Sequence, residues 1–132
     1  MVIPDAWILF QGKKEKIPIL LEIDRGTEHK QQFKQHIKAR IEFIRSGTYL
    51  DVFKEEAILV AYATTGQLPE YRESRRNIMC RWTLELLEEL SLPAWSSVFR
   101  LASVDWDKLY ETRLFDSPVW FQPDKNKPVK LL

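Results

Sequence analysis

The chain has 132 residues, of which 45% are hydrophobic and 30% charged, a composition typical of one globular domain rather than of a disordered or collagen-like chain. No apolar run approaches the roughly 18 residues that a membrane helix needs, and the single cysteine excludes an internal disulfide framework and a multi-cysteine zinc site. Twenty Lys and Arg against 19 Asp and Glu leave a net charge of +1, so any nucleic-acid site must be a local patch. The apolar start contains an aspartate and lacks a basic leader, so we expect a cytoplasmic protein without a secretory signal.

Two strands are predicted at the beginning of the chain. Ala6–Phe10 is apolar at every position, which predicts a strand covered on both faces. Ile17–Asp24 predicts a second strand, with Pro18 near its start, where the missing N–H does least harm. Because Gly12–Glu15 between them has turn composition, we expect an antiparallel hairpin.

A long helix and a third strand follow the hairpin. The helix is expected over Glu28–Ser46, with Thr27 as its N-cap and Gly47 as its C-terminal stop. Its core-facing stripe consists of apolar residues at helical spacing, namely Phe33, Ile37, Ile41 and Ile44. Ala57–Thr64 predicts another buried strand.

The later part of the chain predicts a second helix over Glu73–Leu90 and a fourth strand over Val98–Val104. Residues 105–132 are rich in proline and tryptophan and predict an irregular C-terminal cap, in which Trp120 either covers the sheet or meets a partner. The resulting order, β-β-α-β-α-β, predicts an α/β fold with a mixed sheet flanked by helices, in a single domain of residues 1–132.

The first predicted strand has no preceding element that would cover it. We therefore expect either an excised domain of a longer protein or a homodimer in which another subunit completes the sheet. Both arrangements are compatible with each of the functions considered below. No membrane partner is expected from the composition.

Three carboxylates are expected to meet at the open end of the hairpin. With a two-residue turn between Gly12 and Glu15, the register places Asp5 opposite Glu22, with Cβ atoms roughly 4.5–5.5 Å apart. Asp24 shares their face because strand side chains alternate with period two. Mg²⁺ (or Mn²⁺) would neutralise this cluster and bridge phosphate oxygens, so all three acids are candidate metal ligands. The alternative is that Asp24 caps a helix or turn, Asp5 is solvated and Glu22 pairs with a lysine.

A line of lysines runs along the first predicted helix, with Lys30, Lys34 and Lys38 at positions i, i+4 and i+8. Lys38 adjoins Ile37 near the core boundary, from where it would reach the carboxylates and stabilise charge on a phosphate or position an attacking water. The alternative is a solvated helix face whose lysines pair with Glu42 and its neighbours. Lys38 is thus the candidate catalytic lysine, and Lys34 a candidate DNA contact.

Several stretches resemble the replication-relaxation family of bacterial plasmid and mobile-element proteins. They are Pro4-Asp5-Ala6, the run Leu-Glu-Ile-Asp-Arg-Gly-Thr-Glu over 21–28, and Phe33 to Tyr49 with Lys38 and the ending Ser46-Gly47-Thr48-Tyr49. The resemblance covers about Ile3 to Thr64 and continues in the later half only by the order of elements. That family in turn is similar to the PD-(D/E)xK nucleases, whose core has the same β-β-α-β order around a metal-binding carboxylate pair.

The resemblance implies a restriction-endonuclease-like fold, with Asp5 as the aspartate of the Pro-Asp motif and Glu22 as the acidic residue of (D/E)xK. Asp24 stands at the position of the motif lysine. In some members of the superfamily that lysine migrates to the following helix, where Lys38 is the natural candidate. The family's preceding helix and upstream DNA-binding domain are missing from this chain, so we expect them in a longer natural protein.

Four arginines cluster at the start of the second predicted helix, namely Arg72, Arg75, Arg76 and Arg81. Cations at a helix N-terminus oppose the macrodipole, and a phosphate backbone would offset that cost. Arg72, Arg75 and Arg76 are therefore candidate DNA contacts together with Lys34. The alternative is pairing with glutamates near them in the sequence, namely Glu70, Glu73 and Glu85.

These observations favour a Mg²⁺-dependent DNA-nicking or DNA-cleaving domain of the replication-relaxation type, in which Asp5, Glu22, Asp24 and Lys38 carry the chemistry. DNA is then the substrate and the expected partner. The alternative is a nuclease-like fold without catalysis that tethers DNA or binds a protein, an interpretation favoured by Asp24 at the lysine position.

Overall fold

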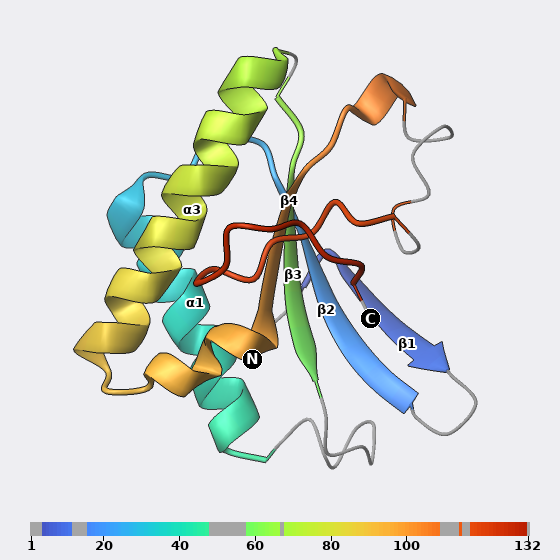
Figure 1. Cartoon of the computed structure of the whole chain (residues 1–132). Coiled ribbons are helices and arrows are strands. Elements are labelled where there is room, and N and C mark those ends of the chain that lie inside the picture. Colours follow the sequence, from blue (N-terminus) through green and yellow to red (C-terminus); the bar gives the residue numbers. More distant parts are fainter. Residues whose placement is uncertain are drawn as a thin grey trace.

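The computed structural model describes residues 4–11, 16–47, 58–66, 68–108, 114 and 117–131. Its elements follow the expected order β-β-α-β-α-β (Figure 1), which confirms the α/β class. The strands are β1 (Ala6–Gln11), β2 (Lys16–Asp24), β3 (Leu59–Thr64) and β4 (Phe99–Ser103), and the helices are α1 (Lys30–Arg45) and α3 (Pro69–Glu89). Two short 3-10 helices, η1 (Pro93–Val98) and η2 (Trp106–Lys108), flank β4.

The described strands form one mixed sheet in the order β1-β2-β3-β4. β1 runs antiparallel to β2, whereas β2, β3 and β4 are parallel to one another. Asp24 pairs with Thr64, and Thr64 pairs with Ser103, so the three parallel strands end side by side. We call this end of the sheet the carboxyl edge. In open α/β sheets, ligands bind outside the carboxyl ends of the strands, which makes it the first place to look for a site.

Both helices cover the same face of the sheet (Figure 1). The core between them joins α1, α3 and the central strands through fully buried side chains such as Phe33, Ile37, Val60, Met79 and Leu101. The predicted apolar stripe of α1 faces this core, since Ile41 is buried as well. Neither helix, nor any other helix among the described residues, is long and apolar enough to cross a membrane.

The other face of the sheet is covered by residues 117–131, which we call the C-terminal strap (Figure 1). Phe121 bridges to Leu101 of β4, and Trp120 bridges to Val129 within the strap. Trp120 is completely buried, and its Nε1 donates to the carbonyl oxygen of Leu114 at 2.8 Å. Of the two predicted roles for Trp120, the structure therefore shows the first, covering the sheet. The strap is irregular, as predicted for the C-terminal cap.

The prediction that the first strand is covered on both faces is wrong. β1 lies at one side of the sheet, and its Trp7, Leu9 and Phe10 are 39%, 48% and 38% exposed. The ring of Phe43 of α1 lies against that of Trp7, with ring centroids 5.8 Å apart. An all-apolar run of this length does not reveal how much of it is covered. Pairing of a second copy with this strand stays a prediction.

The predicted helix starts also differ from the structure. Thr27 is not the N-cap of α1, because the helix begins after His29, which makes no side-chain capping bond. α3 begins at Pro69, four residues before the predicted start, since proline at the first helical position has a suitable φ and lacks only an N–H that would be unpaired there. The predicted turn over residues 12–15 and the predicted strand start at residue 57 lie outside the described residues.

Candidate functional site

The β1–β2 register is the predicted one, with Ala6 opposite Leu21 and Gln11 opposite Lys16. Asp5 immediately precedes β1, so the same register leads to Glu22. The Asp5 side chain is held at β2, where its Oδ2 accepts a hydrogen bond from the backbone N of Ile23 at 2.7 Å. Two of the three predicted carboxylates are thus neighbours at the open end of the hairpin.

Asp24 is buried in an ion pair with Arg75 of α3, and the two side chains are only 5% and 9% exposed. Arg75 Nε donates to Oδ2 of Asp24 and Nη2 donates to Oδ1, both at 3.0 Å. The same Nη2 donates to the carbonyl oxygen of Glu28 at 2.8 Å. This fork-to-fork geometry is the strongest form of guanidinium–carboxylate bond, and it occupies both oxygens of Asp24.

Glu22 pairs with a different arginine, Arg40 of α1, through Nη2 and Oε1. Burial raises the pKa of Glu22, an effect that the nearby Asp5 charge reinforces and that the hydrogen bond from Arg40 only partly offsets. Tyr62 of β3 is buried beside this pair, and burial raises the pKa of its phenol well above the usual range.

Several polar atoms around Tyr62 are buried without a hydrogen-bond partner among the described residues: the Tyr62 hydroxyl, Arg40 Nε and Glu28 Oε2. Glu28 is otherwise engaged, since its Oε1 lies 2.9 Å from Nδ1 of His36.

The structure describes no contact between the predicted catalytic lysine, Lys38, and these carboxylates. Lys38 is exposed on α1, whereas Arg40, two residues further, is buried and reaches Glu22. Arg40 follows the buried Ile37 by three residues, which places both on the same side of a helix. This spacing is the signal in the sequence that favours Arg40 over Lys38 as the α1 residue that reaches Glu22.

Three of the four predicted DNA contacts are engaged within the protein. Lys34 pairs with Glu85 at 3.1 Å and with Glu89 at 2.8 Å, which raises its pKa. Arg72 is buried, and its Nη1 donates to the carbonyl oxygen of Gly66 at 2.8 Å. Arg75 is held by Asp24 as described above. The fourth, Arg76, lies beside the C-terminal strap.

Two of the three predicted Mg²⁺ ligands face arginines: Asp24 faces Arg75 with both oxygens, and Glu22 faces Arg40 with one. Within the described ranges, no group of three or more His, Cys, Asp or Glu side chains is placed to hold a metal ion. Asp24 could bind a Mg²⁺ ion only if Arg75 released one of its oxygens, whereas Glu22 keeps Oε2 outside its pair with Arg40. The three-ligand site stays a prediction; the structure places two ion pairs there.

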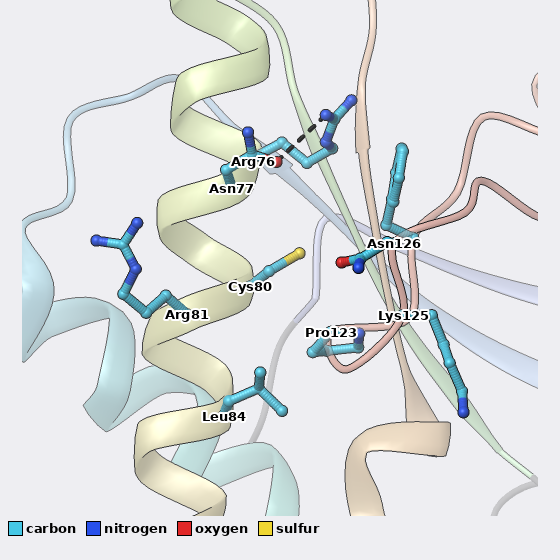
Figure 2. A pocket seen from close by; sticks show the side chains of 9 residues that line it. Arg76, Asn77, Cys80, Arg81, Leu84, Pro123, Lys125 and Asn126 are labelled. Atoms are coloured by element: carbon cyan, nitrogen blue, oxygen red, sulfur yellow. Dashed lines mark hydrogen bonds between the residues drawn. The ribbon is translucent and has the colours of Figure 1, made fainter.

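A cavity of about 480 Å³ separates α3 from the C-terminal strap, and sequence reasoning did not find it. Its cationic lining residues are Arg76, Arg81 and Lys125, and none of the residues that line it is acidic. Figure 2 shows the Cys80 side chain directed across the cavity toward Asn126, whereas Arg81 points away from the strap. Burial raises the pKa of Cys80 to about 11. The thiol is therefore protonated and uncharged near neutral pH.

No family model, curated protein or solved structure matches this chain. Its function must therefore be argued from the geometry of the carboxyl edge, the hairpin and the cavity.

Proposed function

We propose that the chain is a nucleic-acid-binding domain with a nuclease-like α/β core, of the kind the replication-relaxation resemblance implies, in which the hairpin carboxylates stabilise the fold. The observation that carries this proposal is the buried pair of Asp24 and Arg75, because both carboxylate oxygens are already bound by a guanidinium. Glu22 and Arg40 form a second, largely buried ion pair, which engages one oxygen of Glu22.

The restriction-endonuclease-like part of the proposal is supported by the strand order and by the hairpin register. The β-β-α-β order of the resembled superfamily matches β1, β2, α1 and β3. The acids Asp5 and Glu22 lie at the hairpin end at which that superfamily carries its carboxylates.

Nucleic acid as the partner is supported by positive charge that is not fully paired within the protein, since Lys125 reaches Asp124 only at 4.0 Å. The cavity beside α3 has three cationic residues and no acidic one in its lining. Arg25, directly after β2, is exposed at the carboxyl edge. A local cationic site of this kind is the minimum that phosphate-backbone binding requires in a chain of nearly zero net charge.

The proposal is tested by separating DNA binding from DNA cleavage. Fluorescence anisotropy with labelled duplex and single-stranded DNA is expected to show binding that weakens steeply between about 50 and 200 mM salt. With supercoiled plasmid we expect equal nicking in Mg²⁺ and in EDTA. Absence of DNA binding at low salt would contradict the proposal, and so would Mg²⁺-dependent nicking that Glu22→Gln removes.

A second candidate function, Mg²⁺-dependent DNA cleavage, is favoured by one observation. Asp5 Oδ1 and Glu22 Oε2 accept no hydrogen bond from the residues that the structure describes, although the two acids are neighbours. Mg²⁺ is often held by only one or two carboxylates together with substrate phosphates. Calorimetry with Mg²⁺ or Mn²⁺ discriminates between the candidates: millimolar binding that is lost in both Asp5→Asn and Glu22→Gln supports cleavage, and no binding supports the DNA-binding domain.

A further inference from the structure

Arg76 is half-buried and, unlike the buried Arg40 and Arg75, has no carboxylate partner among the residues that the structure describes. Arg40 pairs with Glu22 and Arg75 pairs with Asp24. Arg76 instead donates to Asn77 Oδ1 at 3.2 Å and to Ser103 Oγ at 3.4 Å, distances at or beyond the long end of the hydrogen-bond range. Its Nε is buried and has no hydrogen-bond partner among the described residues.

The Arg76 guanidinium is nevertheless held in place. It stacks on the Phe121 ring of the C-terminal strap, with Cζ 4.1 Å from the ring centroid. Stacking fixes the plane of the guanidinium and leaves its edge, where the N–H donors point, for another ligand. An arginine that is oriented by an aromatic ring and retains unused donors is arranged for bidentate binding of a planar or tetrahedral anion.

We infer that the cavity between α3 and the C-terminal strap binds a phosphate group, with the Arg76 guanidinium as its principal ligand and the Asn126 amide as a second donor. Figure 2 shows Asn126 on the strap side, facing α3. Arg81 and Lys125 line the same cavity and add positive potential, although their side chains point away from its centre in Figure 2.

The volume of the cavity suits a phosphate with part of the molecule that carries it, because small-molecule pockets fall in the range of about 300–1,000 Å³. The phosphate chemistry is shared by a free nucleotide and by a nucleic-acid strand. The phosphate site rests on the proposed function in that it names a phosphate contact for it. It is argued from the cavity alone, so the phosphate site and the proposed DNA binding can fail separately.

Cys80 provides a direct reporter because it is the only cysteine of the chain and its side chain points into the cavity (Figure 2). The unmodified protein is treated with a thiol reagent at mildly alkaline pH, alone and with inorganic phosphate, with 5′-deoxyadenylate or with a short single-stranded oligodeoxynucleotide. Sodium chloride at equal ionic strength is the control. We expect phosphate-bearing probes to slow Cys80 modification several-fold, and equal rates in all solutions would overturn the inference.

The arms of this experiment identify the source of the phosphate. Protection by the oligonucleotide at far lower concentration than by deoxyadenylate assigns the cavity to a nucleic-acid backbone. Protection by deoxyadenylate alone assigns it to a free nucleotide and contradicts the proposed DNA binding, but leaves the phosphate site standing. DNA binding by anisotropy without protection of Cys80 overturns the phosphate site and leaves the proposed function standing.

Arg76→Gln tests the named ligand, and Arg45→Gln is its charge-matched control, because Arg45 is exposed at the end of α1. Loss of a charged hydrogen-bond donor is expected to weaken binding about tenfold or more. For an oligonucleotide the salt dependence should also fall by about 0.7 in log–log slope, one phosphate contact. Equal affinity of Arg76→Gln and Arg45→Gln, with circular dichroism showing both folded, would overturn the role of Arg76.

Discussion

A single guanidinium, that of Arg75, joins three segments that are far apart in the sequence. It binds both carboxylate oxygens of Asp24 at the end of β2 and the carbonyl of Glu28 before α1, while its own backbone belongs to α3. Its Cζ also lies 5.2 Å from the centroid of the Trp82 ring. A buried ion pair need not stabilise more than an apolar pair would, but removing one partner leaves the other charged and desolvated.

Asp24→Asn and Arg75→Met are each expected to lower the free energy of unfolding by about 3–5 kcal/mol, because each leaves one buried group without its partner. The double variant should lose less than the sum of the two. Urea unfolding followed by circular dichroism measures all three, with Arg45→Met as the exposed control, expected within about 0.5 kcal/mol of the unmodified protein. Single-variant losses below about 1 kcal/mol would show that the pair contributes little.

At the scale of elements, α1 has buried and solvent-exposed residues next to each other within a single helical turn. Ile37 is 1% exposed and belongs to the core between α1, α3 and the sheet, whereas Lys38 beside it is exposed. The predicted stripe of α1 therefore faces the sheet, and Arg40 extends the buried side toward Glu22.

Ile37→Ala is expected to destabilise the fold by about 2–5 kcal/mol through the cavity it leaves, whereas Lys38→Ala should change stability by less than about 0.5 kcal/mol. The two neighbouring substitutions control for each other in the same urea titration. A large loss in Lys38→Ala would show that this lysine has an inward role that its exposure does not indicate.

How much of this structure the sequence predicts depends on how far apart the interacting residues lie along the chain. The β1–β2 pairing follows from the short connection between the two strands, so the positions of Asp5 and Glu22 were predictable. The partner of Asp24 was not, since Arg75 is 51 residues away and its charge fits solvent, DNA or an ion pair equally well. Exposure of β1 was also missed, because an apolar run gives no sign of lying at a sheet edge.

For the whole molecule, the sheet is covered unequally on its two faces. Two helices cover one face, and the irregular C-terminal strap covers the other with Trp120 and Leu131. Trp120 is 0% exposed and contacts the sheet face that carries Ile19 and Leu21. Among the described residues no helix packs on that side, so one large side chain supplies much of the buried area there.

Trp120→Ala is expected to lower the free energy of unfolding by about 3–5 kcal/mol, the range for truncating a buried aromatic side chain. Trp120→Phe retains most of the packing but loses the hydrogen bond to Leu114. Its free energy of unfolding should therefore lie between those of the unmodified protein and Trp120→Ala in the same urea titration. Unchanged stability of Trp120→Ala would contradict the assignment of the strap as part of the core.

The burial of Leu131, at 1% exposure beneath the sheet, has a consequence for synthesis of the chain. During synthesis, β1 to β4 can pair and the helices can dock before the strap has left the ribosomal tunnel, but the face that the strap covers stays open to water. The nascent domain therefore exposes an apolar surface of the sheet until Leu131 has emerged and packed against it.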